Sequence, residues 1–338
     1  MKKVRVEDGV GLVLAHDITE IIPGKKKDAA FRRGHVVQKD DVERLLDLGK
    51  GYIYVTEGEE DEVHEDEAAR RIALSTMDEN MELVPAKEGR VNITSKVRGL
   101  VTVDVHRLNR LNRIENVVFT TVPDHYPVNP GDLIAATRII PLLIQEDLLR
   151  RAEFVGREGV IKLLPYAQMK AGLVITGTEV ATGRITDASS RVEEKLKGYG
   201  LELVGKRLVI DEVIKIRDAV MELFEEGADL IITTGGLSVD PDDVTREGVE
   251  ATGARTISYG APVFPGAMFL IARLEGRYIL GAPACVYYNT VTVLDLVLPW
   301  IMAGETVSAS RVRKLALGGL CLHCAECHYP RCFLGKGR

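Results

Sequence analysis

The segment IITTGGLSVDPDDVT, residues 231–245, determines the fold expected for the second half of the chain. Its β-branched apolar start predicts a buried strand, and Gly235 and Gly236 predict a tight turn where that strand ends. Backbone amides in such a turn bind anions. Three aspartates follow the glycines closely, and they would repel a phosphate unless a cation lay between the charges. The segment therefore predicts a turn that holds a phosphate through its amides and through a magnesium ion.

Strands and helices alternate around this segment, from about residue 168 to residue 304. The strands are apolar throughout, which is typical of a parallel sheet covered by helices on both faces. Gly200 is expected to end one helix, Asp211 to cap the next, and residues 286–304 to form one long closing helix. We therefore predict an α/β domain with three layers and a mostly parallel sheet over residues 168–304.

The rest of the chain divides into four segments of different character. A mixed α/β region, a β-rich domain, a helical connector and a cysteine-rich tail are expected at residues 1–80, 81–144, 145–167 and 305–338. Within the β-rich segment, GRVNITSKVRGLVTVDV (89–105) predicts two alternating strands around a turn. The α/β domain is thus expected to follow a β-rich α+β N-terminal region.

Composition and charge argue against two classes of partner. The net charge is −6 and the basic residues form no large block, so nucleic acid is not expected as a partner, because its binding requires a basic surface. The longest apolar stretch, residues 290–304, is interrupted by Asp295 and Pro299, so no membrane span is expected. The first residues lack the apolar core of a signal peptide, and we expect a cytoplasmic protein.

Acidic residues follow two of the predicted strands. TGTEVATGRITDASS (176–190) ends the first strand and carries Glu179 and Asp187, while Asp243 follows the Gly-Gly turn. These three carboxylates are candidates for catalysis, and together with Asp240 and Asp242 they are candidates for magnesium binding, because ligands bind at the carboxyl ends of parallel strands. A structural alternative remains, in which the glycines only form a turn and Asp243 lies at a helix N-terminus.

Three motifs carry a resemblance to a known family. ADLIITTGGLSVDPDDVTREGV (228–249) resembles the signature of the molybdopterin-binding domain shared by molybdopterin adenylyltransferases and molybdopterin molybdotransferases. ITGTEVATGRITDAS (175–189) and YILGAPACVYYN (278–289) are similar to two further motifs of this family. The cofactor-binding positions that we infer with this resemblance are Thr176, Gly177, Thr234, Gly235, Gly236, Ser238, Asp240, Thr245, Pro265, Gly266, Gly281 and Pro283.

The resemblance implies that the chain binds molybdopterin or its adenylylated form in molybdenum cofactor biosynthesis or delivery, with Mg²⁺ at the phosphate. It is compatible with a homo-oligomer and with partners in molybdoenzyme maturation. The chain departs from the family pattern at Ala284–Val286, where Gly-Asn-Pro is usual, and at Phe264 and Ala267, where lysines are expected. These departures favour pterin binding over metal insertion, and a transferase-like activity stays open.

Two alternatives to this function are retained. GGLSVDPDDVTREGV (235–249) is also similar to a run in the competence-damage-inducible nucleotide hydrolases, which act on pyridine nucleotides or ADP-ribose. The second alternative is a non-catalytic protein that senses the pterin or serves as a scaffold.

The tail carries four of the five cysteines, in CLHCAECHYPRC (321–332). The spacing C-x2-C-x2-C-x4-C predicts a metal site with an iron–sulfur cluster or zinc, for which His323 and His328 are spare ligands. Because the tail has few apolar residues, it is expected to become ordered only with its metal and to contribute nothing to the domain core. The fifth, Cys285, is expected to be a small buried core residue. The predicted metal ligands are Cys321, Cys324, Cys327 and Cys332.

Overall fold

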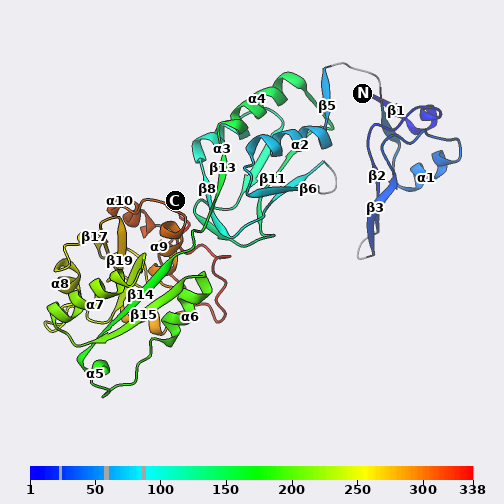
Figure 1. The fold of residues 1–338 in the computed structure, drawn as a ribbon. Coiled ribbons are helices and arrows are strands. Elements are labelled where there is room, and N and C mark those ends of the chain that lie inside the picture. The colour runs from blue at the N-terminus through cyan, green and yellow to red at the C-terminus, as the bar shows by residue number, and fades with distance from the viewer. Residues whose placement is uncertain (23–24, 57–60, 86–88, 338) are drawn as a thin grey trace. The chain divides into compact units, whose positions relative to one another are not determined.

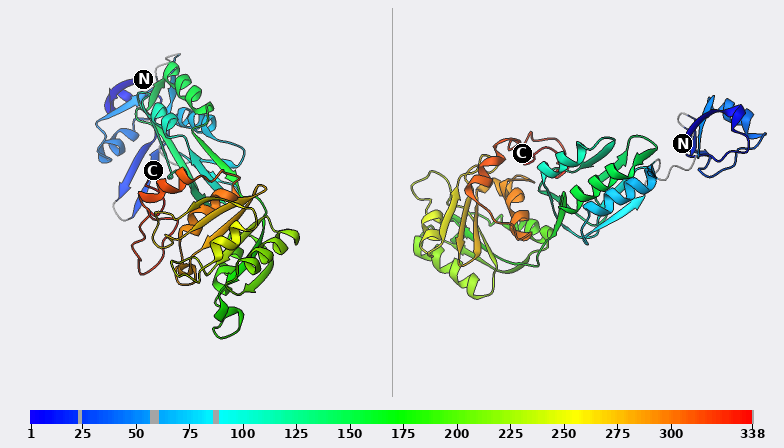
Figure 2. Two further views of the ribbon diagram at one scale, coloured as in Figure 1. Left: turned by 90° about the vertical axis from the view of Figure 1, so that its left-hand side faces the viewer. Right: turned by 90° about the horizontal axis from the view of Figure 1, so that it is seen from above.

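The computed structural model describes residues 1–22, 25–56, 61–85 and 89–337, and its ribbon is drawn in Figures 1 and 2. The chain packs as two units. The first contains residues 1–94, 104–121 and 133–160, and the second contains residues 95–103, 122–132 and 161–338. The five segments expected from the sequence stay a prediction.

The first unit is built from small antiparallel sheets, four α-helices and one 3₁₀ helix among its described residues. The paired strands are β1 with β4, β2 with β3, and β5 with β12, and a four-stranded sheet has the order β6-β7-β11-β9. The β-rich α+β region expected here is thus present. Its strands are β1 (Lys2–Arg5), β2 (Ile18–Ile22), β3 (Lys26–Phe31), β4 (Tyr52–Val55), β5 (Glu62–His64), β6 (Met81–Pro85), β7 (Val91–Ser95), β9 (Val117–Thr121), β11 (Leu133–Ile139) and β12 (Leu143–Gln145), and its helices are η1 (Val6–Gly9), α1 (Asp41–Asp47), α2 (Glu65–Thr76), α3 (Val105–Asn112) and α4 (Glu146–Arg157).

The second unit contains a six-stranded sheet with the order β15-β14-β16-β19-β18-β17. The first four of these strands are parallel, whereas β18 and β17 run antiparallel to their neighbours. A smaller antiparallel sheet has the order β10-β8-β13. The strands are β8 (Gly99–Val103), β10 (Tyr126–Val128), β13 (Ile161–Pro165), β14 (Lys170–Thr176), β15 (Glu202–Val209), β16 (Leu230–Thr234), β17 (Arg255–Tyr259), β18 (Leu270–Leu274) and β19 (Arg277–Ala282).

Helices cover both faces of the six-stranded sheet. Side chains alternate along β14, so that Leu173 faces the core formed with α6 and α9, while Val174 faces the core formed with α7 and α8 (Figure 1). This arrangement confirms the predicted α/β domain with three layers and a mostly parallel sheet. The helices of this unit are α5 (Thr178–Ala181), α6 (Ser190–Tyr199), α7 (Val213–Glu225), α8 (Thr245–Glu250), η2 (Ala284–Tyr287), α9 (Val293–Met302), α10 (Ala309–Arg313) and η3 (Lys314–Ala316).

Local predictions around these helices have mixed outcomes. Gly200 ends α6 in the left-handed conformation, as expected. The single closing helix over 286–304 is wrong: η2 ends at Tyr287, and α9 begins only after Thr292, whose side chain forms a capping box with Asp295. Asp211 does not cap α7 either, because Glu212 is the N-cap and provides no side-chain bond.

Two long-range expectations are also corrected. Both strands expected within residues 89–105 form, but β7 and β8 join different sheets, because β8 pairs with β10 and β13. The tail contributes to the domain core: Leu334 is 3% exposed, and Tyr329 packs against the same apolar cluster. Within the described parts of the chain, we find no helix that could cross a membrane.

Candidate functional site

The Gly-Gly turn lies at the carboxyl end of β16, in the middle of the sheet. Gly235 and Gly236 adopt φ angles of 94° and 55°, a conformation that disfavours side chains. A Cβ atom on Gly235 would lie 2.2 Å from the backbone oxygen of Thr176, and one on Gly236 would lie 2.4 Å from Oγ1 of Thr245. Glycine is therefore required twice, both by the backbone conformation and by close packing.

Three threonines surround the turn with buried hydroxyl groups. Oγ1 of Thr176 and Oγ1 of Thr245 are 2.8 Å apart, and the Thr245 hydroxyl donates to the carbonyl of Gly235 at 3.0 Å. The Thr245 amide also donates to the carbonyl of Gly236. This network joins the end of β14, the turn and the start of α8, so it brings together five of the predicted binding residues: Thr176, Thr234, Gly235, Gly236 and Thr245.

The threonines of β16 have hydroxyl groups that could form further hydrogen bonds. Oγ1 of Thr233 is buried and meets no hydrogen-bond partner among the described residues. Burial raises the pKa of Tyr287, in η2, while a hydrogen bond with the side chain of Thr234 acts in the opposite direction. Polar groups buried at a strand end without a full set of partners favour a ligand or ordered water there.

The loop after the turn is held by its own aspartates. The Ser238 amide donates to Oδ2 of Asp243 at 2.6 Å, and the Asp242 amide donates to Oδ1 of Asp240 at 3.1 Å. Asp240 and Asp242 are exposed, and Asp243 is half-buried. The structural alternative placed Asp243 at a helix N-terminus. Its carboxylate does fix the loop that precedes α8, so it has a structural role there.

The loop after β14 carries the other two candidate carboxylates. Glu179 is exposed in the short helix α5. Asp187 accepts hydrogen bonds from Ser189 and from Nζ of Lys206, which lies 2.8 Å away and also contacts Glu193. Burial works against ionisation of Asp187, but these bonds outweigh it and lower the pKa of its carboxyl group. Asp187 is thus engaged in an ion-pair network, whereas Glu179 faces solvent.

Two residues of this region were not predicted to take part in the site. Oδ2 of Asp211 accepts from the Thr178 amide at 2.8 Å and from its hydroxyl at 3.1 Å, which ties the end of β15 to the loop after β14. Lys206, on β15, bridges Asp187 and Glu193. No local sequence signal marks these contacts, because the partners of Asp211 and Lys206 come from other segments of the chain.

The remaining predicted binding residues belong to two other segments. Gly281, on β19, has no room for a side chain, because a Cβ atom would lie 2.8 Å from Leu270 and 2.9 Å from Leu237, the residue after the glycine turn. Pro283 precedes η2. Gly266 packs against Val293, and the carbonyl of Pro265 accepts from the Val293 amide. These residues shape the backbone around β19 and α9, and Gly177, at φ 143°, begins the loop after β14.

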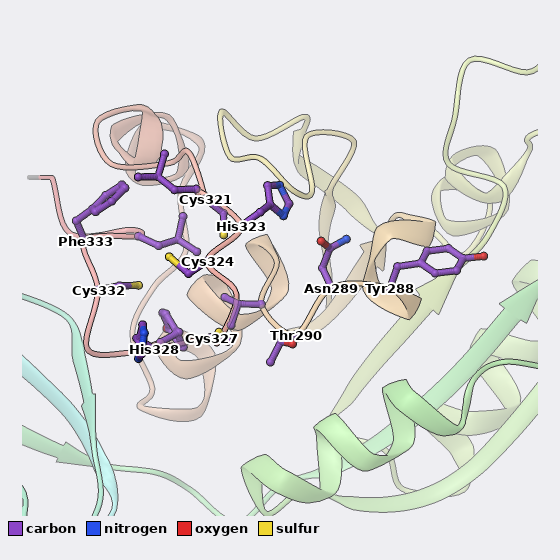
Figure 3. A pocket seen from close by; sticks show the side chains of 14 residues that line it. Tyr288, Asn289, Thr290, Cys321, His323, Cys324, Cys327, His328, Cys332 and Phe333 are labelled. Atoms are coloured by element: carbon purple, nitrogen blue, oxygen red, sulfur yellow. The ribbon is translucent and has the colours of Figure 1, made fainter.

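The cysteines of the tail surround a separate cavity in the second unit. This cavity measures about 230 Å³, and its wall includes the four tail cysteines, His323, His328 and the segment from Tyr288 to Val291 (Figure 3). Cys285 is not part of this wall and is half-buried rather than buried as expected; burial raises the pKa of its thiol. Within the described ranges, no three or more His, Cys, Asp or Glu side chains are placed to hold a single metal ion.

Comparisons with known proteins identify two regions of the chain. The family model described as a probable molybdopterin binding domain matches residues 172–311. A model described as a domain of unknown function (DUF8806) matches residues 3–57.

Curated relatives match less than half of the chain. A CinA-like protein of Mycobacterium tuberculosis is 41% identical over 139 residues, which make up 41% of this chain and 32% of the relative. A CinA-like protein of Mycobacterium avium is 35% identical over 109 residues, or 32% of this chain and 25% of the relative. The chain thus spans a third or less of the length of these relatives.

Solved structures with some similarity include a molybdopterin biosynthesis moea protein from Pyrococcus horikosii, at 13% identity and a TM-score of 0.33 over 72% of this chain and 79% of that one. The protein CinA from Thermoplasma acidophilum has 20% identity and a TM-score of 0.30 over 34% of this chain and 88% of that one. The glycine turn and its buried threonines lie inside the region that the family model matches. Over residues 172–311, the chain is therefore similar to the family described as probable molybdopterin binding domains.

Proposed function

We propose that the second unit binds molybdopterin or its adenylylated form at the carboxyl ends of β14 and β16, in molybdenum cofactor biosynthesis or delivery. The observation that carries this proposal is the turn at Gly235 and Gly236, whose positive φ angles and partly exposed backbone are typical of turns that bind anions. The turn lies in a domain of the probable molybdopterin binding family. A pterin phosphate would be held by successive backbone amides, as anions are held in other turns of this conformation.

The hydroxyl groups around the turn support the same position for the ligand. Thr233 has a buried hydroxyl without a partner in the described structure. The Thr176–Thr245 pair holds the turn against the end of β14, so the amides are positioned before the ligand arrives. A preformed site of this kind costs little ordering entropy on binding.

Magnesium is proposed to enter this site only with the phosphate. The described carboxylates do not form a complete set of metal ligands, but Mg²⁺ typically takes one or two carboxylates and completes its octahedron with phosphate oxygens and water. Asp243 and Glu179 follow two adjacent parallel strands, β16 and β14, so each can contribute an oxygen from its own loop. Asp187 would act through its bonds to Lys206 and Ser189, which fix the loop before α6.

The departures from the family pattern favour binding without metal insertion. Phe264 is 60% exposed and cannot contact a phosphate as a lysine would. Ala284 and Cys285 start the 3₁₀ helix η2 at a place where the family has Gly-Asn-Pro. Compared with the family pattern, this chain thus has fewer cationic side chains that could assist a transferase reaction at Asp243, Glu179 and Asp187.

A nucleotide hydrolase is the second candidate, favoured by the similarity of residues in this domain to CinA-like proteins. The two functions are separated by one set of measurements on protein purified without oxygen. The pterin proposal expects molybdopterin to co-purify, detected by its fluorescence after oxidation, and no turnover of ADP-ribose or pyridine nucleotides with Mg²⁺. Steady hydrolysis of either nucleotide that is abolished in Asp243→Asn would overturn it in favour of the hydrolase.

The same protein distinguishes a transferase from a sensor. Adenylylation of bound molybdopterin in the presence of ATP and Mg²⁺ would assign a transferase activity. Tight pterin binding without any conversion would support the non-catalytic alternative, in which the domain senses the pterin or presents it to a partner in molybdoenzyme maturation.

A further inference from the structure

We propose that Cys321, Cys324, Cys327 and Cys332 hold an iron–sulfur cluster of the [4Fe–4S] type in the cavity of the second unit. The proposal does not depend on pterin binding, because the cavity is lined by none of the residues of the glycine turn. The cysteine spacing is compatible with an iron–sulfur cluster or with zinc, and the proposal chooses the cluster.

All four thiols lie on one cavity. They come from a segment of twelve residues that runs around the hollow and faces Tyr288–Val291. Figure 3 shows the side chains of Cys324 and Cys332 turned toward each other across it. Cys324 and Cys327 are exposed and Cys321 and Cys332 are half-buried, so iron and sulfide can reach the site from solvent while part of it is shielded.

The spacing of the cysteines favours a cluster over zinc. The wall of the cavity of about 230 Å³ includes all four cysteines, so the thiols face one common space. The three cysteines in C-x2-C-x2-C spacing also match the beginning of the ferredoxin run.

The fold positions the cysteine segment without relying on a metal. The Cys321 amide donates to the carbonyl of Phe264 at 2.8 Å, and the hydroxyl of Tyr329 donates to the carbonyl of Asp295, in α9, at 3.1 Å. Leu334 is buried in the domain core just after the last cysteine. Both ends of the segment are therefore fixed to the α/β domain, and only the middle, which bears Cys324 and Cys327, is free to adjust to a cluster.

Charged groups near the segment suit a site that is negative overall. Four thiolates around a cluster core carry net negative charge, which nearby cations and N–H donors stabilise. Lys336 donates from Nζ to the carbonyl of Cys332, and its Nζ lies 5.4 Å from the ring centre of Tyr329. Arg331 adjoins Cys332 and is exposed. His323 and His328 also lie on the wall of the cavity.

Reconstitution of the full chain with iron and sulfide without oxygen tests the proposal. We expect a brown protein with broad visible absorption and about four iron and about four acid-labile sulfide ions per chain. Cys324→Ser and Cys327→Ser should each lose most of the iron, because serine is a poor iron ligand at neutral pH. Both positions are exposed, so the fold, measured by circular dichroism, should be retained.

The fifth cysteine supplies a matched control. Cys285→Ser removes a thiol outside the cavity and should leave the iron and sulfide content unchanged. Three results would overturn the proposal: about one zinc per chain with no sulfide, no metal after reconstitution, or an equal loss of iron in Cys285→Ser and Cys324→Ser.

Discussion

The hydroxyl oxygens of Thr176 and Thr245 lie 2.8 Å apart, and together they occupy the space that a side chain on Gly236 would need. Thr176 ends β14 and Thr245 begins α8, so this contact joins two strand–helix connections at the centre of the sheet. Both threonines are buried. The glycine turn is therefore held in place by these side chains, while Gly235 and Gly236 keep part of their own surface exposed.

Replacement of Gly236 by alanine tests this packing. The new Cβ atom would lie 2.4 Å from Oγ1 of Thr245 at a φ of 55°, so we expect Gly236→Ala to lower the free energy of unfolding by about 2–4 kcal/mol, measured by urea denaturation. Gly253→Ala is the matched control, since Gly253 has φ 84° and nothing within 4 Å of its missing Cβ. It should cost only about 1 kcal/mol. Equal losses in the two variants would show that steric packing at Gly236 contributes nothing.

Neutralising Asp243 tests the role of its charge. Asn in this position still accepts from the Ser238 amide, so we expect Asp243→Asn to keep the thermal stability and to abolish the effect of Mg²⁺ on pterin binding. Asp218→Asn, a change on the surface of α7, should alter neither property. Isothermal titrations with and without Mg²⁺ measure both variants. An unchanged Mg²⁺ effect in Asp243→Asn would exclude this carboxylate as a metal ligand.

Local sequence patterns predicted the features that are local in the structure. The strand that ends in Gly-Gly, the left-handed cap at Gly200 and the apolar face of α7 depend on neighbouring residues, and each could be read from periodicity or turn chemistry. The three-layer domain followed from these elements because apolar parallel strands require cover on both faces.

Features that depend on distant pairing could not be predicted this way. β8 pairs with β10 and β13, which lie in separate parts of the sequence, so the pattern of residues 89–105 could not reveal its partners. Asp211 has the residue type and position of a helix cap, but its carboxylate accepts from Thr178, which lies far away in the sequence, and Glu212 is the N-cap of α7. The tail has few apolar residues, yet Leu334 is buried in the core and Tyr329 packs against the same cluster.

A buried ion pair connects α6 to α9 in the second unit. Nζ of Lys195 lies 2.7 Å from Oδ2 of Asp295, and their side chains are only 10% and 5% exposed. Lys195→Met leaves the aspartate buried without its cation, and we expect a loss of about 3–5 kcal/mol in the free energy of unfolding. Lys197→Met, an exposed change on the same helix, should cost less than about 0.5 kcal/mol. If the denaturation midpoints of the two variants coincided, the buried ion pair of Lys195 and Asp295 would not have the predicted effect on stability.

Acid should weaken the first unit through a second ion-pair network. Arg71, on α2, binds Glu146 and Glu153 of α4 at 2.8 and 2.9 Å. Hydrogen bonds from Arg71 lower the pKa of Glu146 to about 2 and lower that of Glu153 as well. A carboxyl group whose pKa is depressed on folding stabilises the fold above its unfolded pKa, and the stabilisation is lost as the pH falls through the folded value.

The stability of the first unit should therefore decline as the pH is lowered from about 4.5 toward about 2. Arg71→Met should reduce stability at neutral pH and flatten this decline, whereas Arg70→Met, which removes only an exposed pair with Glu67, should do neither. Amide hydrogen exchange in α2 and α4 across this pH range measures both effects. A decline of the same steepness in Arg71→Met would assign the acid sensitivity to other groups.

Equilibrium titration of the purified chain with molybdopterin, without oxygen and with Mg²⁺, tests the central claim most directly. We expect saturable binding that weakens by about tenfold or more in Gly235→Ala, because a Cβ atom 2.2 Å from the Thr176 carbonyl forces the turn to move. The Gly253→Ala variant should bind as the wild type does. No saturable binding by the wild type, or equal binding by a folded Gly235→Ala protein, would contradict a pterin site at this turn.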